Sequence, residues 1–156
     1  FRQEKAQDFE SHERFDAAIC LFTSLGQVDE QGDNLGLVKQ VWSALKVGGW
    51  FVVEVPQHAV AVQQLRPNDR FGNEDSYAVV TRDYDQKSHI LTEEFRVVKF
   101  GNEQHFTLRY RLLSSAELAA LLEGAGFHIE KALGDYAGSA LSADDPMMIF
   151  IARKEG

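Results

Sequence analysis

One transition constrains the fold of this chain more than any other feature: a helical pattern over residues 33–47 runs directly into a continuous apolar segment, Trp50–Val55. Apolar residues in the first segment recur at intervals of three and four, which is typical of a helix with one buried face. Asp33 or Asn34 can cap the start of this helix, and the glycine pair at 48–49 is predicted to end it. A covering helix that turns into a strand in this way is typical of an α/β domain.

A second apolar run, Phe15–Phe22, precedes this helix and is predicted to be a strand buried on both faces. Strand, helix and strand over this length make a crossover unit with parallel strands and a right-handed connection. Cys20 lies inside the first strand and is expected to be a buried packing residue rather than a nucleophile. The fold class is therefore predicted to be α/β.

Residues 66–112, which follow a short helical stretch at His58–Leu65, have a different pattern. Three segments at 76–84, 89–100 and 105–113 alternate apolar and polar residues and are separated by turn-like sequences. They are predicted to form an antiparallel meander with one face in contact with water. The side chains expected to supply much of its buried face are Tyr77, Val79, Ile90, Phe95, Val97, Phe106 and Leu108.

The last part of the chain predicts one more helix and two strands. Ser114 and Glu117 have the spacing of a capping box, in which the serine and the glutamate satisfy each other's backbone at the start of a helix. The helix is predicted to end at a glycine before two strands, Phe127–Ala132 and Met147–Ala152. Neither a repeat nor a linker interrupts residues 1–156, so they are predicted to form a single domain.

Composition and charge argue against several classes of function. The chain has 24 acidic and 16 basic residues, and its net charge of −8 argues against nucleic acid, whose phosphates need a basic face. No apolar run approaches the roughly 20 residues that cross a bilayer, so no membrane partner is expected. The five histidines and the single cysteine lack metal-ligand spacing, so no metal site is predicted. One cysteine also excludes an internal disulfide, which fits a reducing, cytoplasmic location.

Three segments together resemble the carboxyl-terminal half of a class I S-adenosylmethionine-dependent methyltransferase. They read FDAAICLFTSLG, LVKQVWSALKVGGWFVVEV and SSAELAALLEGAGFHIEKALGDYAGS, with Val47 where the family usually has proline. The resemblance covers nearly the whole chain and implies strands four to seven of a Rossmann-like sheet, with residues 66–112 as an antiparallel insert or substrate lid. It also implies methyl transfer from S-adenosylmethionine to a small-molecule acceptor.

The cofactor site that the resemblance implies is incomplete in the sequence. The family's glycine-rich loop after strand one and its acidic residue after strand two have no counterpart, because the chain begins near the family's third strand. The aspartate that usually meets the adenine amino group falls at Lys5, which cannot accept that hydrogen bond, and Glu4 is the neighbouring candidate to replace it. Phe22, Thr23 and Ser24 are expected to form a wall of the cofactor and acceptor pocket, unless they are an ordinary turn.

Candidate contacts to the methyl acceptor come from the insert and from the last loop. Arg109 and Arg111 share one face of the last insert strand, from which they can clamp a substrate carboxylate. Pairing with Glu93 or Glu94 across the sheet is the favoured alternative. Tyr136 lies in the loop that the resemblance places near the acceptor, although an exposed aromatic side chain without a role is equally compatible. No catalytic residue is predicted, since methyl transfer depends largely on holding donor and acceptor aligned.

Two functions of different classes stay open. The first is a methyltransferase of which this chain is the carboxyl-terminal portion, and the second is a non-catalytic remnant that acts as an interaction module. Half of a nicotinamide-dependent oxidoreductase shares the crossover unit but explains the antiparallel tail poorly. In the family's strand order, 3-2-1-4-5-7-6, the strand at 15–22 lies beside a strand one that this sequence lacks. Its bare apolar edge is therefore expected to pair with a second copy as a two-fold homodimer. Burial under residues 1–12, or pairing with the missing half of the fold, is the alternative.

Overall fold

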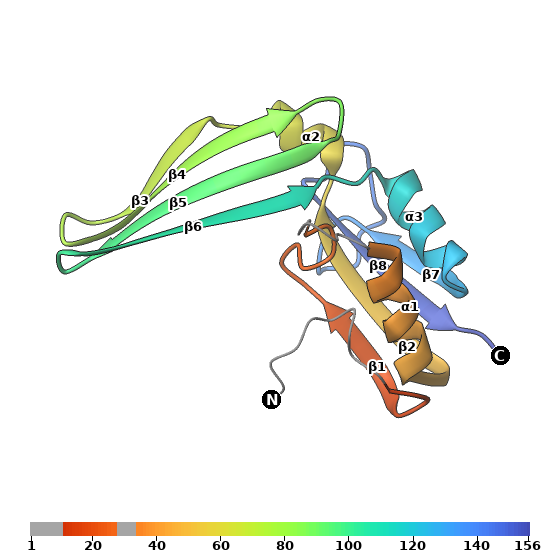
Figure 1. The fold of residues 1–156 in the computed structure, drawn as a ribbon. Coiled ribbons are helices and arrows are strands. Elements are labelled where there is room, and N and C mark those ends of the chain that lie inside the picture. Colours follow the sequence, from red (N-terminus) through yellow and green to blue (C-terminus); the bar gives the residue numbers. More distant parts are fainter. Residues whose placement is uncertain (1–10, 28–33) are drawn as a thin grey trace.

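The computed structural model describes residues 11–27 and 34–156, which form two β-sheets, with two of the three helices packed against the first (Figure 1). The helices are α1 (Asn34–Ala44), α2 (His58–Gln63) and α3 (Ser115–Gly124). The strands are β1 (Phe15–Cys20), β2 (Leu45–Pro56), β3 (Asn68–Gly72), β4 (Ser76–Asp85), β5 (Ile90–Lys99), β6 (Asn102–Arg111), β7 (Phe127–Leu133) and β8 (Met147–Lys154). The predicted class, α/β with an antiparallel insert, is confirmed.

The first sheet has the strand order β1-β2-β8-β7. β1 and β2 are parallel, as the crossover pattern predicts, whereas β8 runs antiparallel to both of its neighbours. Alternate residues of the sheet, including Phe51, Val53 and Phe150, are buried in one core with Leu118 and Leu122 of α3. α1 lies on the same face of the sheet and contacts α3, so the two helices cover one side of it (Figure 1).

The boundary between α1 and β2 differs from the prediction. The helix ends at Ala44, and the glycine pair lies inside β2 rather than at the end of the helix. Phe15 of β1 pairs with Leu45 of β2, whereas Ala17 pairs with Trp50. Two positions along β1 therefore correspond to five along β2, so β2 bulges here. Gly48 has a φ of +80°, and a Cβ at Gly49 would stand 2.8 Å from the carbonyl oxygen of Lys46. The glycines are therefore needed for a bulge that lets Leu45 reach the core.

β1 is an edge strand among the described residues, and the prediction that both of its faces are buried is wrong. Ala18 and Cys20 pack against the core, but Ile19 is 71% exposed. Burial raises the pKa of the Cys20 thiol, which agrees with a packing residue. The apolar run predicts a fully covered strand, whereas nothing in the described part of the chain covers the face that carries Ile19.

We expect the 156-residue chain to associate through this edge of β1, because no second strand pairs with β1 on that side among the described residues, and an apolar edge strand invites pairing with another chain. Sedimentation velocity over a dilution series should show a monomer–dimer equilibrium. Ile19→Lys should shift it towards monomer, since lysine on an edge strand opposes pairing, whereas Val47→Lys, at a site 58% exposed and outside β1, should not. A concentration-independent monomer with rapidly exchanging β1 amides would contradict the expectation.

The insert is antiparallel, as predicted, but its order β3-β4-β5-β6 contains four strands rather than three. β3 has the sequence NDRFG, in which one large apolar residue makes no alternating pattern. It forms because Asn68 to Gly72 pair with the backbone of β4. The sequence of β3 does not indicate these hydrogen bonds, because they depend on a neighbouring strand rather than on the residues of β3.

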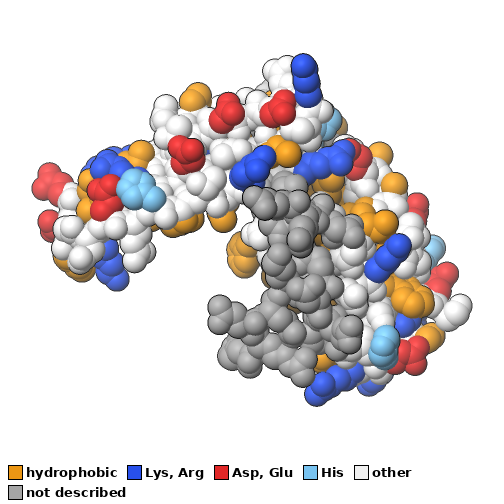
Figure 2. All heavy atoms as spheres, viewed as in Figure 1, with side chains coloured by type: hydrophobic (Ala, Val, Ile, Leu, Met, Phe, Trp, Pro, Cys, Tyr) orange, Lys and Arg blue, Asp and Glu red, His pale blue; other side chains and the backbone are white. Residues whose placement is uncertain are grey.

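The predicted buried face of the insert is wrong, because the residues chosen for it lie on both faces. Directly opposite residues share a face, and Val79 lies opposite Arg96 while Val80 lies opposite Phe95. Val80 and Leu91 are the buried apolar side chains of the insert strands. The register groups these two with Phe71, Phe95, Val97, Phe106, Leu108 and Tyr110, here called the apolar face of the insert. Hydrophobic side chains are visible along the lower side of the insert, towards the first sheet (Figure 2).

The capping box at the start of α3 is present as predicted. The Ser114 hydroxyl accepts from the Glu117 amide at 3.2 Å, and a Glu117 carboxylate oxygen accepts from the Ser114 amide at 2.8 Å. This reciprocal pair fixes the point at which the chain leaves the insert and returns to the first sheet. Within the described residues, no helix has the length and hydrophobicity needed to cross a membrane.

Candidate functional site

The chain leaves β1 and β2 at one edge of the first sheet, and two other segments, the end of β6 and the β7–β8 loop, meet there. Gln27 forms an antiparallel bridge with Tyr110 at the end of β6. The side-chain amide of Gln57, just after β2, donates to the carbonyl of Ala143 in the β7–β8 loop at 2.6 Å. The carboxyl ends of parallel strands are where open α/β sheets place their ligands, so this edge is the candidate site.

The loop after β1 has an unusual backbone at the predicted cofactor wall. Phe22 and Thr23 have φ angles of 55° and 61°, in the left-handed region that non-glycine residues seldom occupy. The Ser24 hydroxyl donates to the carbonyl of Leu21 at 2.9 Å, which closes the turn. The Phe22 side chain is 82% exposed and therefore available to a ligand.

Gly26 attaches this loop to the base of the insert. Its carbonyl accepts from the Arg111 amide at 2.8 Å, and its amide donates to the Asn34 side chain at 2.9 Å. Asn34 therefore binds the loop rather than capping α1, while Asp33 lies outside the described residues. A Cβ at Gly26 would lie 2.9 Å from the Arg111 carbonyl oxygen, and φ is +103°, so this close approach requires glycine.

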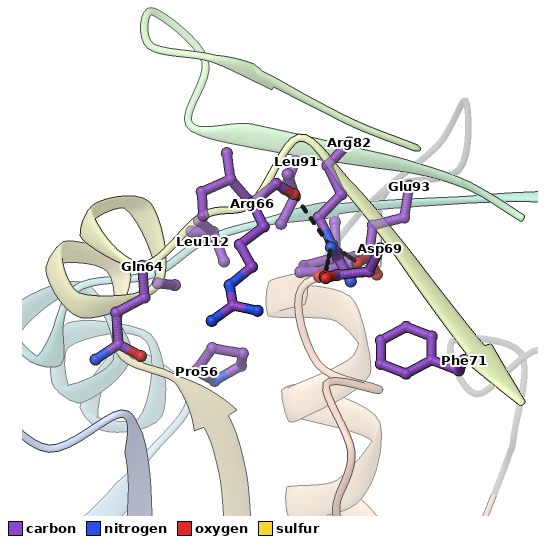
Figure 3. A pocket seen from close by; sticks show the side chains of 12 residues that line it. Pro56, Gln64, Arg66, Asp69, Phe71, Arg82, Leu91, Glu93 and Leu112 are labelled. Carbon is purple, nitrogen blue, oxygen red and sulfur yellow. Dashed lines mark hydrogen bonds and ion pairs between the residues drawn. The ribbon is translucent and has the colours of Figure 1, made fainter. Parts of the chain in front are cut away.

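A pocket of about 360 Å³ opens between α2, the end of β2 and the apolar face of the insert (Figure 3). Its apolar lining includes Pro56, Ala61, Leu65, Phe71, Leu91 and Leu112. Its polar lining is Gln64, Arg66, Asp69, Arg82, Glu93 and Tyr110. The lining is therefore half apolar and half polar, and the volume is within the range of small-molecule sites.

Arg82 is the centre of an ion cluster on one wall of the pocket. Its Nε donates to a Glu93 carboxylate oxygen at 2.6 Å, and its Nη1 donates to Asp69 at 2.5 Å. The second Glu93 oxygen accepts from the Tyr110 hydroxyl at 3.1 Å. Burial, followed by the nearby Glu93 charge, raises the pKa of the Tyr110 phenol, which therefore stays protonated and acts as a donor. The cluster therefore links all four strands of the insert, β3 to β6.

A second polar cluster joins α2 to the β4–β5 turn. The Nε2 atom of His58 lies 2.6 Å from the Tyr84 hydroxyl, and the centroids of the His58 and His89 rings are 4.3 Å apart. Partial burial and the neighbouring His89 lower the pKa of His58, so its imidazole is neutral at pH 7. The Leu112 amide donates to the His89 carbonyl at 2.9 Å. This cluster does not line the pocket and attaches the insert to α2.

The predicted site residues are only partly brought together. Glu4 lies outside the described residues. Arg111 pairs with Glu117 at 2.6 Å, so its guanidinium is engaged at the start of α3, while Arg109 is exposed on the same face of β6. Tyr136, in the β7–β8 loop, is 77% exposed. Neither arginine lies on the apolar face that forms the pocket wall, because both alternate with Tyr110 along β6.

Sequence reasoning missed the residues that form the polar wall of the pocket. The sequence offers Glu93 as a partner for Arg109 or Arg111, but in the structure it pairs with Arg82 of the neighbouring strand. The β4–β5 pairing register places Arg82 directly opposite Glu93, so this register would have predicted the ion pair. Glu54 in β2 does not line this pocket: it is 5% exposed, and its Oε2 has no hydrogen-bond partner within the described residues. No group of three potential metal ligands occurs in the ranges that the structure describes.

Comparison with known proteins gives structural similarity alone. No family model matches the sequence, and no curated protein matches it either. The CcbJ methyltransferase from Streptomyces caelestis is similar over 98% of this chain, with a TM-score of 0.81 and 20% identity. An S-adenosylmethionine-dependent methyltransferase from Clostridium acetobutylicum is similar over 98% of the chain, with a TM-score of 0.80 and 12% identity. CalS10, an amino pentose methyltransferase from Micromonospora echinaspora solved with S-adenosylmethionine bound, is similar over 97%, with a TM-score of 0.62 and 17% identity.

The chain spans only part of these solved proteins, namely 62%, 63% and 63% of their lengths. The match extends through both sheets, because it covers 97% or more of this chain in each case. The order β1-β2-β8-β7 is that of strands four, five, seven and six in the resemblance drawn from the sequence. The chain therefore has the fold of the carboxyl-terminal part of a class I methyltransferase, with an antiparallel insert.

Proposed function

We propose that this chain is the acceptor-side portion of an S-adenosylmethionine-dependent methyltransferase that acts on a small molecule. The observation that carries the proposal is the similarity of the whole described chain, including its insert, to solved methyltransferases. The pocket at the carboxyl edge of the sheet supports it, since its size and mixed lining suit a small organic acceptor.

The described residues fit part of this cofactor. The exposed Phe22 ring and the left-handed turn at Phe22-Thr23 offer an aromatic surface and an open backbone at the edge of the sheet. When bound, S-adenosylmethionine supplies a methyl group on a positively charged sulfur that a nucleophile can attack in line. The chain's own task is to orient the acceptor in the pocket and keep water away from it, which is the main source of rate in such transfers. The acceptor proton leaves to solvent or to a neighbouring base.

Cofactor binding tests the proposal. We expect the 156-residue chain to bind S-adenosylhomocysteine weakly or not at all in calorimetric titration, because it lacks the glycine-rich loop and the acidic ribose contact. The protein in the length that its gene encodes should bind it, and amide resonances of Phe22, Thr23 and Ser24 should shift. A low-micromolar dissociation constant for the 156-residue chain would overturn the first expectation. Failure of the gene-length protein to bind would overturn the assignment of function.

An interaction module is the second candidate, and two exposed apolar side chains at the end of β1 and in the loop after it favour it. Ile19 and Phe22 are 71% and 82% exposed, so both apolar side chains are available to a partner. A gene-length protein that assembles through β1 and binds no S-adenosylhomocysteine would support this second function over the first.

A further inference from the structure

Among the polar groups of the pocket that are not already engaged within the protein, hydrogen-bond donors outnumber acceptors. Both oxygens of Glu93 are already engaged, one by Arg82 and one by the Tyr110 hydroxyl. One oxygen of Asp69 accepts from Arg82. By contrast, the guanidinium of Arg66 has no hydrogen bond or ion pair within the described residues, and a guanidinium carries five N–H donors and no acceptor. A ligand that complements this pocket is therefore an acceptor of hydrogen bonds.

The backbone of Arg66 is held in place although its side chain is exposed. Its carbonyl accepts from Nη1 of Arg82 at 3.1 Å, and the carbonyl of the next residue, Pro67, accepts from the Arg82 amide at 2.8 Å. Proline also restricts the residue before it to an extended backbone. The side chain points from the α2–β3 connection into the pocket, towards Pro56 (Figure 3). An arginine anchored in this way loses less freedom when it binds a ligand.

The charges of the pocket lining also favour a ligand whose hydrogen-bond acceptor lies at Arg66. The Asp69, Arg82 and Glu93 cluster carries two negative charges and one positive charge, so Arg66 brings the pocket lining to a formal charge of zero. The surplus negative charge lies on the insert wall, whereas the free cation lies at the α2–β3 connection. An anionic group is therefore attracted to Arg66 alone, and the rest of the ligand faces Phe71, Leu91 and Leu112.

We propose that this pocket binds a molecule with a carboxylate or phosphate group on Arg66 and an apolar body against Phe71, Leu91 and Leu112. The inference rests on the proposed function in one respect, namely that the bound molecule is the methyl acceptor. If the proposed function holds, the methyl acceptor is therefore an organic anion. Planar, bidentate recognition of carboxylate and phosphate is the chemistry for which a guanidinium is best suited.

Four small aromatic probes test this with the 156-residue chain. Benzoate and phenyl phosphate carry the two candidate anions, whereas benzyl alcohol is neutral and benzylamine is a cation. Titrations followed by amide and arginine Nε–H resonances, at constant ionic strength, should show at least one anion binding about tenfold more tightly than benzyl alcohol, the factor expected for one charge-assisted contact. The stronger of the two anions distinguishes a carboxylate from a phosphate ligand.

A matched pair of variants locates the contact. Arg66→Gln should bring both anions to the affinity of benzyl alcohol, whereas Arg70→Gln should change nothing, because Arg70 lies over the Tyr77 ring on the opposite face of the insert. Equal anion affinities in wild type and Arg66→Gln would overturn the proposal. So would tighter binding of benzylamine that is lost in Glu93→Gln, since the pocket would then be a cation site. The gene-length protein separates the two proposals. If it binds anions at Arg66 but does not bind S-adenosylhomocysteine, the proposed anion site is supported and the proposed methyltransferase function is refuted.

Discussion

Replacement of Phe51 with alanine should lower the free energy of unfolding by about 3–5 kcal/mol, the range for removing a large aromatic side chain from a well-packed core. Phe51 is 0% exposed in β2, and its ring centroid lies 5.3 Å from that of Phe127 in β7. It also lies in the cluster that contains Leu118 and Leu122 of α3. Its loss therefore leaves a cavity where the sheet and the covering helix meet. Urea unfolding, with midpoint and slope compared to wild type, measures the effect.

Trp50 is the matched control for this substitution. It precedes Phe51 in β2 but points to the opposite face of the sheet, where it is 40% exposed beneath Arg153, whose guanidinium carbon lies 5.2 Å from the ring centroid. Trp50→Ala should cost less than about 1 kcal/mol, as surface substitutions usually do. Equal losses for the two variants would mean that another chain or segment covers the Trp50 face in solution.

Arg82→Met should destabilise the protein by about 2–3 kcal/mol, somewhat less than a fully buried ion pair, because the groups keep some contact with water. The side chains of Arg82, Glu93 and Asp69 are 16%, 13% and 23% exposed. Without the guanidinium, two carboxylates face each other in a partly desolvated pocket wall. The insert should loosen first, which hydrogen exchange at β3 and β4 amides would detect along with the loss of stability.

A triple variant separates the loss of the cation from the loss of the side chain. Arg82→Met combined with Asp69→Asn and Glu93→Gln removes the uncompensated negative charges and should recover at least half of the lost stability. If the triple variant is as unstable as Arg82→Met alone, packing of the arginine stem, rather than charge, is the cause. A single variant with wild-type stability would show that water already screens the cluster.

Much of the fold can be predicted from local patterns in this sequence. The crossover from β1 through α1 to β2, the capping box at Ser114 and Glu117, and the antiparallel nature of residues 66–112 all follow from spacing and turn chemistry. Each of these depends on neighbours within a few residues, so the sequence records them directly. The resemblance to methyltransferases depends on the same local segments, and the fold comparison confirms it.

The candidate site is less predictable, because long-range register decides it. Alternation places Tyr110 and Arg111 on opposite faces of β6, but it does not tell which face meets α2. Arg82 and Glu93 become partners only through the β4–β5 pairing, and Arg66 enters the pocket only because the chain after α2 folds against β4. Side chains proposed from the loops, such as Tyr136, remain in solvent for the same reason.

The sequence by itself therefore determined the kind of each main element and the order in which the elements follow one another, since hydrophobic period and capping are local properties. Tertiary structure decided which of two adjacent aromatic residues, Trp50 or Phe51, is buried, and that the glycine pair at 48–49 forms a bulge instead of ending a helix. It also decided that β1 is an edge strand among the described residues and that Arg82 pairs with Glu93. The physical reason is that burial and ion pairing depend on which distant strands and helices come together. A hydrophobic pattern indicates the kind of element that a residue belongs to, but it does not identify the residues that pack against it.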